Sequence, residues 1–342
     1  MAWLSARCWA VGAALAMAAA AVLPAAPSAA QSFYQGRTLT IIVGTQSGGG
    51  FDINSRLLAR HVGRHIPGRP DVIVSNIIGA GSLTAIRHVE TVAPRDGTVI
   101  VNFNFGLIGM SKLAPDKAPV DFRRFAWIGS ISQDLTACYV WHGTGVRTLA
   151  DLKTRKNVHF GQSSPGGNDD INVRILKNLF RVDLKQVGGY PGSAALRLAL
   201  ERGELDGGCG SWNSVPEEWV VRRLVTPVYH TGDTPATDMP PGVPAVLDLA
   251  TDPRERAVVR LLTAHNELGR PYMVSPAVPA DRIEMLREAF ARTMTDPEFL
   301  ADAAKLRMPV SPRAAAESLR IVGEIYATPD DIIAAARKVV EE

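Results

Sequence analysis

Short β-rich runs alternate with helical periodicity over most of the chain, and this alternation limits the folds that it can adopt. Strands are predicted at 39–43, 72–74 and 98–103, with helices at 53–66 and 83–92 between them. Strand–helix–strand order of this kind predicts parallel strands in a sheet that is covered by helices, which is an α/β fold.

The same alternation resumes in the second half of the chain. Strands are predicted at 158–160, 184–187 and 205–209. The helix before the last of these strands is expected to be capped by Ser193 and to end before Gly203, because Ser favours the first position of a helix and Gly the position after its end. A second α/β unit is therefore expected.

The chain has 342 residues, which is long for one small core. We predict two lobes, each a mostly parallel sheet flanked by helices, joined by crossing strands at 125–131 and 268–275. The first lobe would comprise residues 31–130 together with 269–342, and the second lobe residues 131–268.

The first 30 residues have the composition of a secretory signal. Arg7 is their only charged residue, an apolar run covers 8–23, and small residues precede a cleavage site between Ala30 and Gln31. The apolar run is shorter than the ~20 residues that a spanning helix needs. We therefore expect a cleaved signal and a periplasmic protein rather than a membrane-anchored one.

Cys138 and Cys209 are the only cysteines after this signal. An oxidising compartment would allow them to pair. Both lie in strand-like surroundings, so we favour two small buried apolar side chains, and the pairing stays open.

Several functional classes are disfavoured by the sequence. With 37 basic against 34 acidic residues and no basic run, nucleic acid is not an expected partner. The glycines at 44–50 form neither a P-loop nor G-x-G-x-x-G, and no G-x-S-x-G is present. His61 and His65 lack the Glu of H-E-x-x-H, so we expect a solvated helix face. No metal and no cofactor are expected.

Four glycine-rich loops, each of which follows a predicted strand, are the expected place for ligand chemistry. They lie at 43–52, 74–82, 161–170 and 188–193. Glycine allows the chain to bend and a ligand to approach the backbone, and the first N–H groups of a helix have no partner within it. Ligands bind at the carboxyl ends of parallel strands. Two loops per lobe therefore predict one small anion in a cleft.

In this order behind an export signal, the loops resemble those of the periplasmic solute-binding receptors of tripartite tricarboxylate transporters, the Bug or TctC type. The resemblance covers nearly all of the chain from Phe33 onward. It is carried by IIV at 41–43, SGGGFD at 47–52, VSN at 74–76, GAGS at 79–82, APRDGT at 93–98, GYPGS at 189–193, GELD at 203–206 and DPEF at 296–299.

The resemblance implies two lobes that close on a small carboxylate through loop backbone and bridging water. It implies a receptor that performs no bond chemistry and delivers its ligand to integral-membrane transporter subunits, and we expect a monomer. Carried over to this sequence, the ligand-binding residues would be Thr45, Gln46, Ser47, Gly48, Gly49, Gly79, Gly81, Ser82 and Asn104 in the first lobe, and Ser163, Ser164, Asn168 and Ser193 in the second.

Some residues depart from the family pattern. Arg270 replaces an aromatic and is a candidate contact to a second carboxylate of the ligand. Asp169 and Asp170 add negative charge beside the third loop, which would favour a ligand with an amine. A surface ion pair is the alternative in each case. Asp52 is expected to brace the first loop rather than to touch the ligand.

Two other classes of function stay open. An exported hydrolase or lyase would use Asp169 with His159 or Arg270 as an acid–base pair. A ligand sensor would dock on a membrane kinase instead of a transporter. The sequence does not choose among mono-, di- and tricarboxylates, amino acids and aromatic acids as the ligand.

Overall fold

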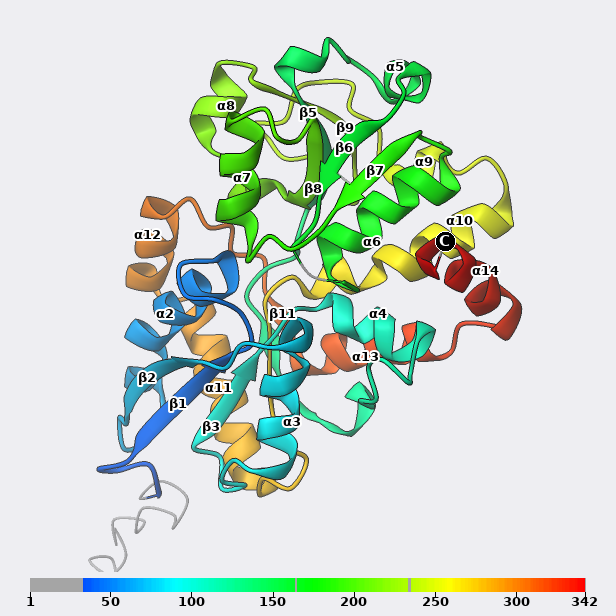
Figure 1. The fold of residues 1–342 in the computed structure, drawn as a ribbon. Helices are drawn as coiled ribbons and strands as arrows, with labels where there is room; N and C mark the ends of the chain where they lie inside the picture. Colours follow the sequence, from blue (N-terminus) through cyan, green and yellow to red (C-terminus); the bar gives the residue numbers. More distant parts are fainter. Residues whose placement is uncertain (1–32, 164, 233–234, 342) are drawn as a thin grey trace, which may run out of the picture.

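The computed structural model describes residues 33–163, 165–232 and 235–341. The predicted export signal and Ser164 lie outside these residues. Two sheets, each flanked by helices, form two lobes that lie one above the other in Figure 1. The predicted two-lobed α/β architecture is therefore confirmed. No helix in the described ranges is long and apolar enough to cross a bilayer.

The first sheet has six strands in the order β11-β4-β10-β3-β1-β2. Its first three strands along the chain pair in parallel, and the other three join antiparallel. The strands are β1 (Thr38–Val43), β2 (Asp71–Asn76), β3 (Val99–Asn102), β4 (Ala126–Ser130), β10 (Pro271–Val274) and β11 (Arg313–Ala314).

The second sheet has five strands in the order β7-β6-β8-β5-β9. Strand β6 is parallel to both of its neighbours, whereas β5 is antiparallel to both of its own. The strands are β5 (Thr136–Trp141), β6 (Val158–Gly161), β7 (Leu184–Val187), β8 (Gly207–Ser211) and β9 (Val225–His230).

Both sheets are thus mixed, where mostly parallel sheets were predicted. The parallel strands of each sheet are those in which strands and helices alternate along the sequence. In the first sheet, the antiparallel part arises because the chain leaves the lobe at the end of β4 and returns into β10, which pairs beside β4 in the opposite direction. No bounds were predicted for β5, which begins the second lobe, although Cys138 was expected in strand-like surroundings.

Helices cover both faces of each sheet. In the first lobe, α2, α11 and α12 pack on one face and α3, α4 and α13 on the other. In the second lobe, α6 and α10 cover one face, and α7 and α8 pack on the other. The helices of the first lobe are α2 (Gly50–Val62), α3 (Leu83–Thr91), α4 (Gly106–Leu113), α11 (Ala280–Met294), α12 (Pro297–Lys305) and α13 (Ala315–Tyr326).

The remaining helices are shorter on average, and one contains a π-helical turn. They are α5 (Leu149–Thr154), α6 (Asn168–Arg174) with its π-helical continuation Ile175–Leu179, α7 (Ser193–Glu201), α8 (Glu217–Val221), α9 (Val246–Leu249), α10 (Pro253–Thr263) and α14 (Asp330–Glu341). Short 3-10 turns occupy Gly63–His65, Ala80–Ser82, Phe122–Arg124, His142–Thr144, Trp212–Ser214 and Ala264–Leu268.

Helix starts follow the sequence signals in part. Asp296 caps α12 by accepting hydrogen bonds from the amides of Glu298 and Phe299, and Pro297 occupies the first helical position. At α7 the cap is Gly192, and Ser193 is the first helical residue without a side-chain cap. Strand β11 comes directly before α13, which begins at Ala315 without a side-chain cap.

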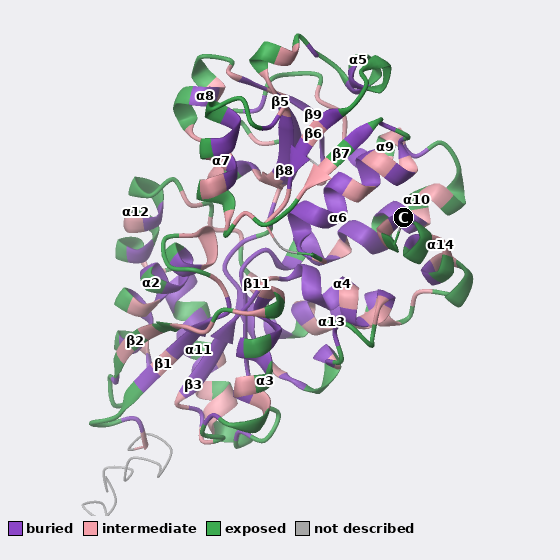
Figure 2. Cartoon of the chain, in the orientation of Figure 1, coloured by how far each residue is buried: buried purple, intermediate pink, exposed green. Residues whose placement is uncertain are grey.

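One apolar core contains residues of both lobes. It runs from the α3 and α4 face of the first sheet, through α10, α13 and α14, to the second sheet (Figure 2). Helix α14 contacts both lobes, since Arg337 donates to the carbonyl of Leu113 at 2.7 Å and Asn178 donates to the carbonyl of Val339 at 2.6 Å. The limits proposed for the lobes remain a prediction.

The two histidines of α2 and the following turn do not form a solvated helix face, contrary to our expectation. His61 is buried and lies 3.1 Å from a carboxylate oxygen of Asp302, and His65 lies 2.7 Å from that of Asp296. These contacts attach α12 to α2. No group of three or more potential metal ligands occurs in the described part of the chain.

Cys138 and Cys209 form a disulfide, and the preference for two unpaired cysteines was wrong. The two residues lie directly opposite each other on the antiparallel strands β5 and β8. This register brings together residues that are 71 positions apart, and no local pattern reveals it. Strand β8 has the sequence GGCGS, so this disulfide is its main side-chain anchor in the second lobe.

We predict that replacing both cysteines by Ala lowers the free energy of unfolding by about 4 kcal/mol, because the disulfide restricts a loop of about 70 residues in the unfolded chain. Urea unfolding of the oxidised protein and of the variant measures this difference. Reaction of both thiols with a thiol reagent in unfolded but unreduced protein would contradict the assignment.

Candidate functional site

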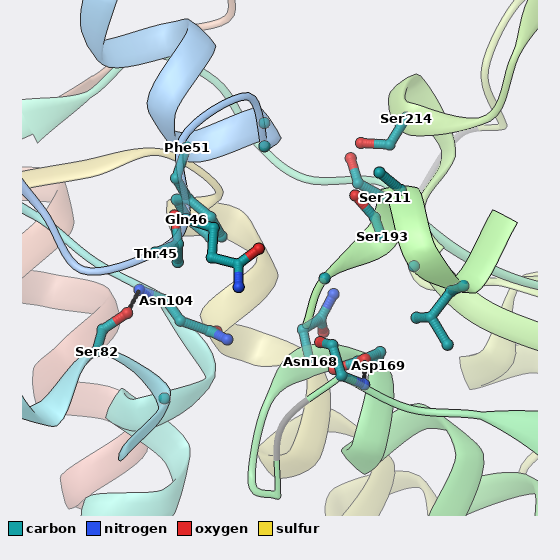
Figure 3. Close-up of a pocket in the computed structure, with 18 of the residues that line it drawn as sticks. Thr45, Gln46, Phe51, Ser82, Asn104, Asn168, Asp169, Ser193, Ser211 and Ser214 are labelled. Atoms are coloured by element: carbon teal, nitrogen blue, oxygen red, sulfur yellow. Dashed lines mark hydrogen bonds between the residues drawn. The ribbon is translucent and has the colours of Figure 1, made fainter. Parts of the chain in front are cut away.

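A cavity of about 560 Å³ lies between the two lobes, at the carboxyl ends of the parallel strands. Figure 3 shows Gln46 and Asn104 of the first lobe on one side of this space and Asn168, Ser193 and Ser211 of the second lobe on the other. The volume is within the usual range for small-molecule sites.

The structure brings the predicted site residues together around this one cavity. All of them that are described line it, and only Ser164 lies outside the described residues. Those that line it are Thr45, Gln46, Ser47, Gly48, Gly49, Gly79, Gly81, Ser82, Asn104, Ser163, Asn168, Ser193 and Arg270. Their contact with a ligand remains a prediction.

Cavity-lining residues of both lobes have backbone amides without an acceptor among the described residues. Eight of these amides lie in three segments, three in each of the two first-lobe loops and two at the start of α7. Each has no hydrogen-bond acceptor among the described residues, and each belongs to a residue that lines the cavity. They are Thr45, Gln46 and Ser47, then Gly79, Ala80 and Gly81, and finally Ser193 and Ala194. Such amides offer an anion hydrogen bonds from a fixed frame.

The first loop is held by a buried carboxylate, as the sequence predicted for Asp52. Its side chain is 2% exposed and accepts from the amide of Gly48 at 2.8 Å, from Asn76 at 3.0 Å and from Arg56 at 2.9 Å. Burial alone would raise the pKa of Asp52, but these hydrogen bonds outweigh it and lower the pKa. Gly48 has a φ of +80°, which favours glycine there.

The third loop is held in the same way in the second lobe. The amide of Gly166, with a φ of +73°, donates to Asp170 at 2.7 Å, and Asp170 in turn pairs with Arg174 at 2.8 Å. The amide of Ser163 donates to Asp169. This loop therefore uses two of its amides internally, while the amides of Asn168 and Asp169 at the start of α6 have no acceptor among the described residues.

Asp169 differs from Asp170 because it lines the cavity. Burial raises the pKa of Asp169, although its hydrogen bonds with Ser163 oppose this shift. The predicted surface ion pair does not describe either residue, since both side chains are buried and Asp170 is enclosed by the loop, by Arg174 and by Gln186.

Two of the predicted contact residues use their side chains in hydrogen bonds with neighbouring segments of the protein. Ser82 has a φ of +88°, and its hydroxyl donates to the carbonyl of Gly44 at 3.0 Å and accepts from the amide of Asn104 at 3.1 Å. The Asn168 side chain donates to Thr136 and lies 3.5 Å from Asp134. Both residues hold neighbouring segments in place beside the cavity.

Arg270 and Asp134 form the floor of the cavity, where the two connections between the lobes meet. They are 6% and 4% exposed, and their charged groups are 3.7 Å apart. Asp134 also accepts from Ser211 and from Thr136. The Arg270 guanidinium lies 4.9 Å from the ring centroid of Phe51. Arg270 therefore forms a buried ion pair with Asp134. The alternative, a surface ion pair, was wrong.

Several residues that line the cavity were not predicted, among them Asp134, Tyr139, Arg197 and Ser214. Asp134 lies in a connection between strands, where no motif marks it. Arg197 lies one helical turn after Ser193, so helical periodicity from the fourth loop could have indicated it.

Known proteins share this fold at low sequence identity. No family model matches the chain. A curated relative, the UPF0065 protein in the TAR-I ttuE-ttuC' intergenic region of Agrobacterium vitis, is 24% identical over 282 residues, which is 81% of this chain and 77% of the relative. The solved periplasmic binding protein BugD is 16% identical, with a TM-score of 0.70 over 90% of this chain and 98% of that chain.

The chain has the fold of a Bug-type periplasmic binding protein. A second solved structure, MatC from Rhodopseudomonas palustris with bound malate, is 17% identical and has a TM-score of 0.69 over 87% of this chain and 99% of that chain. The resemblance that was predicted from the loops is thereby confirmed at the level of fold.

We predict that Asp52→Asn lowers the free energy of unfolding by about 2 kcal/mol at pH 7, because a charged acceptor of several hydrogen bonds is lost. The folded-state pKa of Asp52 lies below its ordinary value, so its stabilisation is complete above about pH 4 and is lost as pH falls through the folded pKa.

Urea unfolding of both proteins between pH 7 and pH 3 measures this effect. The difference between wild type and variant should shrink below pH 4. A constant difference over the whole range would contradict the role assigned to the Asp52 carboxylate.

Proposed function

We propose that this protein is an extracytoplasmic receptor that captures a small organic carboxylate between its lobes and delivers it to integral-membrane subunits of a tripartite tricarboxylate-type transporter. It binds as a monomer, and it performs no bond chemistry. The ligand stabilises the closed arrangement because it bonds to loops of both lobes at once.

The convergence of free amides from both lobes on one cavity supports this proposal most directly. Thr45 to Ser47 and Gly79 to Gly81 belong to the first lobe, whereas Ser193 and Ala194 begin a helix of the second. A carboxylate between them would accept charge-assisted hydrogen bonds of about 1.5–3 kcal/mol each. A few such bonds are enough for micromolar binding after the losses on association.

The relatives support the same class of ligand. MatC was solved with malate, a small carboxylate, and BugD is described as a periplasmic binding protein. The sequence signal at 1–30 fits export, and delivery to a membrane transporter follows from the family resemblance.

An enzymatic role receives less support from the site. His159, one candidate partner for Asp169, lies on β6 beside Asp206 and is not among the residues that line the cavity. Arg270, the other candidate, is paired with Asp134. Neither predicted acid–base pair is therefore assembled around Asp169 in the described residues.

Ser193 offers a direct test of the amide contacts. It is the first residue of α7, where Pro is tolerated because the N–H has no partner within the helix. We predict that Ser193→Pro weakens carboxylate binding about tenfold, whereas Ser193→Ala, which keeps the amide and removes only the hydroxyl, weakens it less than about threefold.

The ligand for this comparison comes from a thermal-shift screen of mono-, di- and tricarboxylates, amino acids and aromatic acids, followed by calorimetry. Equal affinities of the Pro and Ala variants would contradict the contact from the Ser193 amide. Absence of stabilisation by every carboxylate, together with turnover of some substrate, would overturn the proposed function.

A further inference from the structure

The charged side chains around the cavity are not equivalent. Four of the described lining residues carry ionisable acids or guanidinium groups: Asp134, Asp169, Arg197 and Arg270. Asp134 and Arg270 neutralise each other at the floor. Asp169 accepts the amide of Ser163. Neither Asp169 nor Arg197 has an ion-pair partner among the described residues, and Arg197 is the one unpaired cation of these four.

Arg197 is half-buried in the wall that the second lobe contributes to the cavity. Its guanidinium donates to the carbonyl of Ser214 at 3.1 Å, which uses one of its five N–H donors. No carboxylate of a described residue lies within ion-pair distance of it. The rest of the planar fork remains available to an acceptor in the cavity.

The surroundings of Arg197 suit a second polar end of a ligand. The Tyr139 side chain lines the same wall and is buried, which raises its pKa to about 12, while the positive charge of Arg197 acts in the opposite direction. The charges of Arg197 and Asp169 act on the pKa of this phenol in opposite directions. A neutral phenol and a guanidinium both donate hydrogen bonds.

Arg197 belongs to the second lobe and lies near the point where this lobe approaches α2. Ser214, whose carbonyl it contacts, approaches Gly50 at the start of α2, where a Cβ atom would lie 3.7 Å from the Ser214 hydroxyl. The first-lobe amides and Arg197 thus line one cavity of about 560 Å³, on the walls that the two lobes contribute. A ligand that spans this cavity can present one anionic group to each wall.

We propose that Arg197 is a specificity-determining residue that binds a second anionic group of the ligand and so selects doubly charged carboxylates over monocarboxylates of the same length. This inference rests on the proposed function. It adds a cationic side chain to a site whose family resemblance implies contacts from loop backbone and water.

The expected preference for doubly charged ligands arises because the Arg197 guanidinium loses water when the lobes close. An Arg side chain that loses water without a counter-charge is destabilised. A carboxylate of the ligand supplies that counter-charge and accepts two parallel hydrogen bonds in a geometry that the planar fork matches. An amide of equal size supplies neither the charge nor the second acceptor.

The test compares dicarboxylates with their own monoamides in the wild type and in Arg197→Gln. Succinate, glutarate and adipate are each paired with the monoamide of the same length, and calorimetry gives the ratio of affinities within a pair. Wild type should prefer the best dicarboxylate over its monoamide by about 10- to 100-fold. In Arg197→Gln this preference should fall to about threefold or less, while monoamide binding persists.

Arg202→Gln is the matched control, because it removes the same charge from the C-terminal end of the same helix. Arg202 is exposed, lies outside the cavity and faces Glu204 at 3.9 Å. The Arg202→Gln variant should prefer the dicarboxylate over its monoamide by the same factor as wild type. Arg197→Lys keeps the charge without the fork and should retain an intermediate preference, which also covers the case in which the Gln variant does not fold.

A preference that survives in Arg197→Gln, or a wild type that binds monoamides as tightly as dicarboxylates, would overturn the role of Arg197 and leave the proposed receptor intact. Failure of wild type to bind any carboxylate or monoamide would instead remove the proposed function, and this inference with it.

Discussion

A buried carboxylate one turn into a helix holds the preceding glycine loop open, and this contact occurs once in each lobe. In the first lobe Gly48 donates its amide to Asp52, which pairs with Arg56. In the second lobe Gly166, Asp170 and Arg174 repeat the contact at the same spacing. A neighbouring strand adds Asn76 in one case and Gln186 in the other. The carboxylate fixes the loop without occupying the cavity.

The two loops differ in what they leave for a ligand. Asp52 takes only one amide of its loop, so the amides of Thr45 to Ser47 remain free at the cavity. In the second lobe, Asp169 takes a further amide and places its own carboxylate in the wall. The second lobe therefore presents free amides at the starts of α6 and α7, together with the side chains of Asp169 and Arg197. This asymmetry would give the ligand a defined orientation.

The fold class and the loops around the cavity could be predicted from the sequence, because strand and helix periodicity and glycine-rich turns are local features. The mixed sheets could not, since β4 meets β10 only after the chain has passed through the second lobe. The disulfide could not be predicted either, because it depends on the register of β5 against β8, which are distant in sequence. Asp134 has no motif around it, and its function as partner of Arg270 appears only when two distant connections meet.

The central claim is that amides from both lobes bond to one anion, and amide NMR of the ¹⁵N-labelled protein tests it most directly. During titration with the tightest carboxylate, the N–H resonances of Gln46, Gly81 and Ser193 should shift downfield together and give one dissociation constant. Shifts confined to one lobe, or different dissociation constants for the two lobes, would contradict a ligand that is held between them.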